Sequence, residues 1–180
     1  HRLWGHLIGI VFLIPFLVFL FQRRFSSEMI KPMVILFLLG GLQGAIGWIM
    51  VKSGLNDENL YVSHIRLAIH FIMALGLLAY TFWFALQLLV PRRQLIADVP
   101  LKRFTIGLIG LLVVQLVYGA FMAGLKAAAV APTWPSINGE YFPSNLSSYQ
   151  GRQLSFFSGM INNPIIVQFI HRNLAYLLSL

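Results

Sequence analysis

The chain has 180 residues, of which 58% are hydrophobic and only 10% are charged. A soluble domain carries about a quarter charged residues, so this composition excludes a soluble globular protein and indicates an integral membrane protein. The net charge of +8 does not indicate nucleic-acid binding, because the Lys and Arg residues lie mostly between the apolar runs. The absence of cysteine excludes disulfides, thiol chemistry and iron–sulfur clusters within these residues.

Five apolar runs follow one another along the chain. About 20 apolar residues are needed to cross a bilayer as a helix, so four runs are predicted to be complete spans and the last an incomplete one. The chain is therefore interpreted as an internal piece of a longer, all-α membrane protein with antiparallel helices. The predicted spans are residues 3–21, 32–51, 65–90, 104–125 and 165–180.

The loops between these spans differ in charge, which predicts their orientation. Cytoplasmic loops carry an excess of Lys and Arg, so the loops after the first and third spans are predicted to be cytoplasmic. Their basic residues are Arg23, Arg24, Lys31, Arg92, Arg93, Lys102 and Arg103. The long segment 126–164, rich in Pro, Gly, Asn, Ser and aromatic residues, then lies on the outer side, where it could pack at the interface or form a lid.

Two histidine–arginine pairs open apolar runs, and each histidine heads a stripe of small residues four apart. The stripes are His1, Gly5, Gly9 and His171, Ala175, Ser179. Residues four apart share one helix face, and small residues there also occur where helices simply pack. A histidine at the head of both stripes favours haem ligation, because ionisable residues inside spans are rare and functional.

His70 lies inside the third span and is the third predicted ligand. His64 is six residues earlier, which turns it about 120° away from His70, so the two cannot bind one iron from one helix. Arg66 shares the face of His70 and could bind a haem propionate or extend to the interface. His64 is interpreted as a solvated histidine at the membrane surface, and His6 as a packing or surface residue.

A shorter repeat also occurs, in which Gln43-xxx-Gly47-xx-Met50 recurs as Gln115-xxx-Gly119-xx-Met122. It is weaker support for a duplicated protein than the two histidine stripes, which are 170 residues apart. Two similar halves would each be a four-helix bundle with two facing histidines, enough to hold one haem.

The segments "GGLQGAIGWIMVKSGL", "VSHIRLAIHF", "TWPSINGEYFP" and "VQFIHRNLAY" resemble, in order, motifs of the haem A synthase family in its cysteine-free type. The resemblance implies eight transmembrane helices in two pseudo-symmetric four-helix halves. It further implies oxidation of the C8 methyl group of haem O to a formyl group, giving haem A for terminal oxidases. Haem O is then the substrate, haem b the bound cofactor, and the haem O synthase a partner for delivery.

The same resemblance assigns residues. His1 and His70 match the histidine pair of the substrate haem, and His171 matches the first ligand of haem b. Arg2, Arg66 and Arg172 are expected near the propionates. The fourth ligand and the acidic catalytic residue of the family are expected outside the chain, so the catalytic residue is unknown and these residues alone are expected to be inactive. In place of common family residues, His6 replaces an Arg and Lys126 an Asp.

The resemblance divides the chain into residues 1–90, the rest of the N-terminal half, a cytoplasmic linker 91–103, and residues 104–180, the start of the C-terminal half with its outer loop 126–164. The expected location is a bacterial cytoplasmic membrane or a mitochondrial inner membrane, with the haem sites outward. The electron acceptor, the oxygen source and a homo-oligomeric state are left open.

Two other classes of protein compete with this interpretation. A bis-histidine electron-transfer cytochrome would favour haem sites at both membrane sides, whereas all the predicted ligands here lie on one side. A transporter would have midplane sites and broken helices, whereas the predicted ligands are shallow and Pro15 is the only break predicted. A haem-free assembly factor would leave the histidine stripes unexplained.

Overall fold

The computed structural model describes residues 2–54, 60–91, 97–144 and 147–180, without the side chains of Arg2 and His6. The prediction of an all-α membrane protein is confirmed, because four helices in this part of the chain are long and apolar enough to cross a membrane. They are α1 (Arg2–Phe21), α2 (Ser27–Val51), α3 (His64–Leu89) and α4 (Val99–Leu125). A fifth helix, α7 (Pro164–Ser179), has 16 residues and is shorter than these, as its sequence predicts.

Helices α2 and α4 each begin five residues before the predicted spans, at 27 rather than 32 and at 99 rather than 104. The predictions placed the helix starts where the charges end, but charged first turns continue both helices beyond their apolar stretch. Asp98 caps α4, because its side chain accepts a hydrogen bond from the backbone N–H of Leu101 at 2.9 Å. Pro100 is tolerated in this first turn, where its missing N–H has no helical partner.

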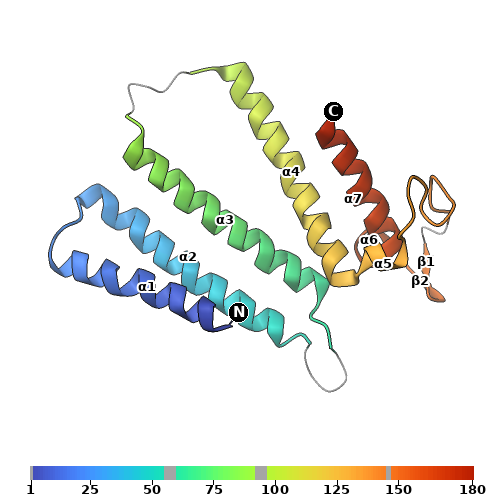
Figure 1. Cartoon of the computed structure of the whole chain (residues 1–180), viewed down its shortest axis with the longest axis horizontal. Helices are drawn as coiled ribbons and strands as arrows, with labels where there is room; N and C mark the ends of the chain where they lie inside the picture. The colour runs from blue at the N-terminus through green and yellow to red at the C-terminus, as the bar shows by residue number, and fades with distance from the viewer. Residues whose placement is uncertain (1, 55–59, 92–96, 145–146) are drawn as a thin grey trace.

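The long helices lie side by side in chain order, α1, α2, α3, α4 and α7, each antiparallel to the one before it (Figure 1). Each packs against the next along the chain. The turns α1–α2 and α3–α4 therefore lie at one end of the helices, and the connections α2–α3 and α4–α7 lie at the other (Figure 1). His70 and His171 belong to helices that start at this second end.

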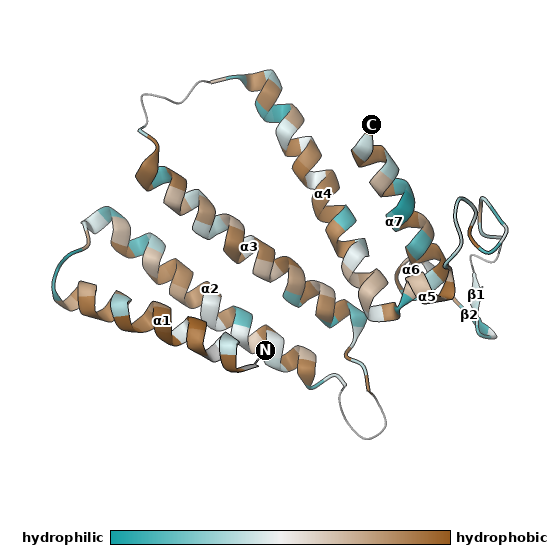
Figure 2. Cartoon of the chain, in the orientation of Figure 1, coloured by the Kyte–Doolittle hydropathy of each residue, from teal (hydrophilic) through white to brown (hydrophobic). Residues whose placement is uncertain are grey.

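The outer surfaces of the helices are apolar, as contact with lipid requires. Figure 2 shows the long helices hydrophobic along most of their length, with a hydrophilic stretch in the middle of α7. Large side chains such as Trp48 and Trp83 are 61% and 60% exposed. In water such exposure would be unfavourable, whereas hydrocarbon replaces the missing contacts.

The best-packed region lies where α3, α4 and α7 meet. Its buried core consists of Ala68 from α3, Ala120 and Phe121 from α4, and the fully buried Val167 from α7. The two alanines let the helices approach closely, which is how membrane helices gain packing energy. This core joins α3 to α4 across the predicted linker, and α4 begins inside that linker, while the division into two halves stays a prediction.

The predicted long loop 126–164 contains short ordered elements. They are α5 (Ala127–Val130), an antiparallel hairpin of β1 (Ser148–Tyr149) and β2 (Arg152–Gln153), and α6 (Phe156–Asn162). The hairpin turn is Gln150–Gly151, with both φ values positive. A second two-residue turn, Asn138–Gly139, also has positive φ values, a conformation that Asn and Gly adopt readily.

Candidate functional site

His70 lies nearly two turns into α3, and its imidazole rests against Gly47 of α2. A methyl group built on Gly47 would come within 2.9 Å of Cε1 of the His70 ring, so only glycine leaves the ring its place. One turn earlier on the same face of α2, the Nε2 atom of Gln43 donates a hydrogen bond to the backbone oxygen of His70 at 3.0 Å. Gln43 and Gly47 together therefore form a seat for His70.

His171 occupies an equivalent seat in the next helix pair. It lies seven residues into α7, and a methyl group on Gly119 of α4 would be 3.4 Å from Cε1 of its ring. The imidazole faces the backbone of Gln115, one turn before Gly119. The repeat Gln-xxx-Gly thus contacts a histidine twice, once between α2 and α3 and once between α4 and α7.

Both seats contain buried polar atoms without hydrogen-bond partners. Among the described residues these are the Nδ1 atoms of His70 and His171 and the Oε1 atoms of Gln43 and Gln115. Buried polar atoms are normally hydrogen-bonded, so each such atom calls for an explanation. A neutral imidazole that binds a metal through one nitrogen and donates from the other fits this donor set, so both histidines are suited to hold a haem iron.

His64, at the start of α3, has different surroundings. Its ring packs edge-on against Phe121 of α4, with ring centroids 5.6 Å apart, and its Cα and Cβ lie against Gly124. Its Nε2 atom is buried and without a hydrogen-bond partner. His64 is therefore a packing residue between α3 and α4, rather than the solvated surface histidine that its sequence position predicts.

Arg66 and Arg172, the predicted propionate ligands, donate to backbone oxygens in this structure. Arg66 donates from one nitrogen to Ile49 at the end of α2, at 3.0 Å. It also lines a hollow of about 180 Å³ whose other walls are apolar, formed by Ile46, Ile49 and Ile69. A guanidinium has five N–H donors, so the remaining ones could still bind a carboxylate, and the propionate role stays a prediction.

Arg172 organises the outer segment. Its guanidinium donates to the backbone oxygens of Thr133 at 2.9 Å, Pro135 at 3.3 Å and Ser136 at 3.4 Å. Close by, the indole N–H of Trp134 donates to the hydroxyl of Tyr176 on α7. The "TWPS" segment is therefore held against α7 by the residue that follows His171.

Replacing Arg172 by methionine should loosen this segment. Loss of its charge-assisted hydrogen bonds is expected to lower the local opening free energy by about 1–2 kcal/mol, which increases the open population roughly 5- to 30-fold. Limited proteolysis should then cut residues 126–163 correspondingly faster. Arg152→Met on the exposed β2 strand is the matched control, and equal cleavage of the two variants would contradict the role of Arg172.

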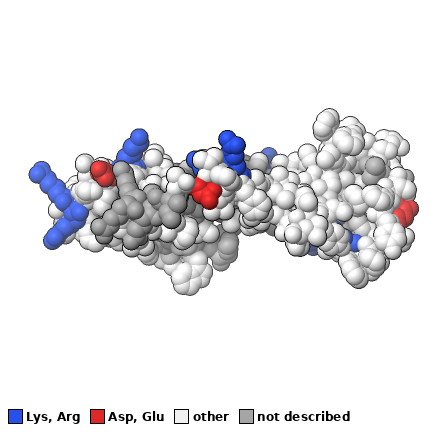
Figure 3. Space-filling model, turned by 90° about the horizontal axis from the view of Figure 1, so that it is seen from above, with Lys and Arg blue, Asp and Glu red and all other residues white. Residues whose placement is uncertain are grey.

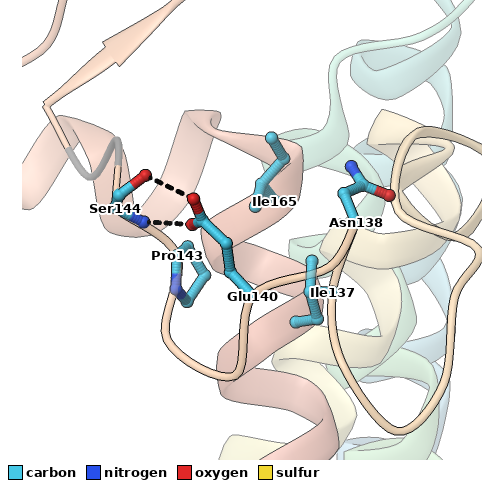
Figure 4. A pocket seen from close by; sticks show the side chains of 6 residues that line it. All are labelled: Ile137, Asn138, Glu140, Pro143, Ser144 and Ile165. Atoms are coloured by element: carbon cyan, nitrogen blue, oxygen red, sulfur yellow. Dashed lines mark hydrogen bonds between the residues drawn. The ribbon is translucent and has the colours of Figure 1, made fainter.

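Glu140 forms a second local structure in the outer segment, beside a hollow of about 180 Å³ (Figure 4). Its carboxylate accepts hydrogen bonds from the backbone N–H of Ser144 at 2.7 Å and from the Ser144 hydroxyl at 2.8 Å. These bonds favour the charged form and lower the pKa of Glu140. The residues lining the hollow are Ile137, Asn138, Glu140, Pro143, Ser144 and Ile165.

The lowered pKa of Glu140 predicts a pH dependence of the turn at Ser144. Because the folded pKa lies below the ordinary carboxyl value, the stabilisation is present above that ordinary value and is lost as pH falls through the lowered one. Hydrogen exchange of the Ser144 amide, corrected for intrinsic rates, should increase across that acidic range. In Glu140→Gln this step should vanish, because an amide oxygen does not titrate; a persisting step would assign it to another group.

The N-terminal histidine pair cannot be completed here, because His1 lies outside the described residues and the side chain of Arg2 is also not described. In the part of the chain that the structure describes, no three His, Asp or Glu side chains form a cluster for a bare metal ion. The sequence predictions did not place Gln43 and Gln115 beside the histidines, although their repeat with Gly47 and Gly119 is visible in the sequence.

The fold and these seats define an integral membrane protein of packed apolar helices, with histidines held near one end of the spans. The chain belongs to the cytochrome oxidase assembly protein family, whose model matches residues 1–180.

Individual relatives agree with this membership. The chain is 38% identical to a protein of Flavobacterium johnsoniae named heme A synthase, over 98% of the chain and 51% of the relative. It is 42% identical to a protein of that name from Maricaulis maris, over 100% and 51%, and 41% identical to one from Rhodopseudomonas palustris, over 99% and 48%. The chain thus spans about half the length of the curated relatives it matches. No solved structure matches it.

Proposed function

We propose that this chain is part of a haem A synthase, which oxidises the C8 methyl group of haem O to a formyl group. The observation that carries the proposal is the repeated seat, in which Gly47 makes room for the ring of His70 and Gly119 lies beside the ring of His171. A protein with haem ligands in two helix pairs, within a family whose relatives are named heme A synthase, is suited to bring a substrate haem near a second haem.

Each histidine has its own part in the proposal. His171 holds haem b, and His70, together with His1, holds the substrate haem O. Bound haem b supplies a route by which electrons leave the substrate, whose conversion from methyl to formyl is an oxidation. The acceptor beyond haem b and the source of the new oxygen atom are left open.

The arginines are proposed to bind the propionates on the outer side. Arg66 is the best placed of them, because its guanidinium borders an apolar hollow and is committed to one backbone oxygen. Arg172 already donates to three backbone oxygens. It would therefore influence propionate binding indirectly, by holding the outer segment in place. Arg2 follows His1 and is proposed to act beside it.

The proposed orientation places the haem sites toward the outer side of a bacterial cytoplasmic membrane. Figure 3 shows Lys and Arg side chains gathered at the end of the molecule that carries the α1–α2 turn and near the start of α4. An excess of positive charge marks the cytoplasmic side. Apolar haem O could then arrive through the bilayer from the haem O synthase, and the apolar outer surfaces of α1 to α4 are compatible with such lateral access.

The proposal is tested in a host that makes haem O but no haem A. The full-length protein is expressed there, and its haems are extracted and separated by chromatography with mass detection. A formyl-bearing haem that appears with the wild type and disappears with His70→Ala is the expected result. Bound haem b without any oxidised haem O would instead support a bis-histidine electron-transfer cytochrome, and a protein without haem would exclude both functions.

A further inference from the structure

We propose that Gln43 and Gln115 are positioning residues that orient His70 and His171 for iron ligation. Each carboxamide oxygen would accept a hydrogen bond from Nδ1–H of the histidine on the facing helix. The inference rests on the proposed function, because it needs a haem iron at the other ring nitrogen. The sequence pattern of the histidines alone gives no indication of a role for the glutamines.

The first observation is that the seat occurs twice with the same spacing. In each helix pair the glutamine lies one turn before the glycine that faces the histidine, at 43 and 47 and at 115 and 119. The two pairs are joined by very different connections, residues 52–63 and residues 126–163. The shared arrangement therefore does not come from a shared loop. It indicates that each histidine needs the glutamine and the glycine on the facing helix.

The second observation is that the unpartnered atoms in each seat complement one another. One is a carboxamide oxygen, which can only accept, and the other is an imidazole Nδ1, which donates when it carries the ring proton. Both are buried in an apolar helix pair, where water is not available to satisfy them. In the haem-bound protein a change of the glutamine side-chain conformation would bring the two atoms together. For Gln43 the new bond would replace the present bond to the backbone oxygen of His70.

This hydrogen bond would prepare the histidine for iron ligation. A histidine binds iron through one nitrogen, and the hydrogen bond made by the other fixes the tautomer and the ring orientation. A proton held on Nδ1 leaves the lone pair of Nε2 free for the iron. Donation to a good acceptor also makes the imidazole a stronger donor to the metal, which stabilises the ferric form and lowers the reduction potential.

Helix packing alone does not explain why the acceptor oxygens of both glutamines are buried without a partner. The hydrogen bond from Nε2 of Gln43 to the backbone oxygen of His70 is a typical interhelical contact of a polar residue in a membrane. It uses the donor half of the carboxamide and leaves the acceptor half buried and unpaired. For Gln115 the side-chain acceptor is unpaired in the same way, although the backbone of Gln115 is a competing partner for the His171 ring.

The test uses the full-length protein with its haems bound, and measures the midpoint potential of each haem by spectroscopic redox titration. The variants are Gln43→Leu, Gln43→Glu, Gln115→Leu and Gln115→Glu. Gln87→Leu is the matched control, because Gln87 is an exposed glutamine on α3. Haem content is measured on the same samples.

Each leucine variant is expected to raise the potential of one haem, and the glutamate at the same position to bring it back to the wild-type value or below. Gln43 and Gln115 should affect different haems, with Gln87→Leu unchanged. If both variants at a site lost haem while the potential of the remaining haem stayed at the wild-type value, the glutamines would be packing residues and the inference would be wrong. Wild-type protein without haem would instead disprove the proposed function.

Discussion

Replacing His70 by alanine is expected to remove one of the two haems from the full-length protein, whereas replacing His64 should remove neither. The two histidines lie on the same helix, but only His70 has its ring against a glycine. His64 meets Gly124 with its Cα and Cβ, and its ring packs against Phe121. Outer-shell partners of a metal ligand are already worth about 10- to 100-fold in metal affinity, so loss of a ligand should cost more than about 100-fold at this site. At working concentrations such a loss empties the site.

The measurement is the number of haems per protein, with each haem identified by mass after extraction. Wild type and His64→Ala should both carry two haems, while His70→Ala should keep only haem b. His171→Ala should show the converse and keep the substrate haem. Haem retained in full by His70→Ala and lost from His64→Ala would exchange the roles of the two residues and refute the assignment of the seat.

The helices of this protein could be predicted closely from the sequence, because the lipid-facing surfaces make each span a long run of mostly apolar residues. The end of α2 at Val51 and the end of α4 at Leu125 agree with the predictions. The starts of α2 and α4 do not, since Asp98 and the residues that follow Ser26 continue a helix outside the bilayer core. Hydropathy indicates the part of a helix that contacts lipid, but it does not indicate polar turns that extend the helix beyond the bilayer core.

The seats of the histidines could be predicted only in part. The sequence predicted His70 and His171 as ligands, and in the structure each lies about two turns from a helix start. Which residues face them depends on the register between two helices, and no property of a single helix determines that register. The contact of His70 with Gly47 therefore needed the structure, even though the repeat of Gln43 and Gly47 was recognised.

The outer segment shows the same limit for irregular structure. The Asn138–Gly139 dipeptide indicates a tight turn, and that signal could have been used. The bonds of Arg172 to Thr133, Pro135 and Ser136 involve backbone oxygens, which every residue has, so no side-chain pattern could reveal them. An arginine beside a predicted haem ligand indicates a propionate partner. In the structure, however, Arg172 donates hydrogen bonds to backbone oxygens of the outer segment.

Replacing Gly124 by alanine is expected to destabilise the protein by about 1–3 kcal/mol, the typical cost of overpacking. A methyl group on Gly124 would lie 2.5 Å from Cβ and 2.7 Å from Cα of His64. The contact with Cα is with backbone, so no side-chain rotation relieves it and α3 must move away from α4. The neighbouring core around Ala68 and Phe121 would lose contacts as well.

Gly110→Ala on the same helix is the matched control, because nothing lies within 4 Å of the position its methyl group would take. It should be neutral or stabilising by up to about 1 kcal/mol, since alanine favours the helix over glycine. Unfolding titrations in mixed micelles would compare the two free energies of unfolding. Equal changes would mean that α3 and α4 are not in close contact at His64.

A double-mutant cycle makes the same test independent of helix propensity. In a His64→Gly background the Cβ atom of residue 64 is gone, so Gly124→Ala should cost less than it does in the wild type. Direct contacts of this kind give coupling energies of about 0.5–3 kcal/mol. A measurable coupling would establish that α3 and α4, which the predicted linker 91–103 assigns to different halves, pack together in one core.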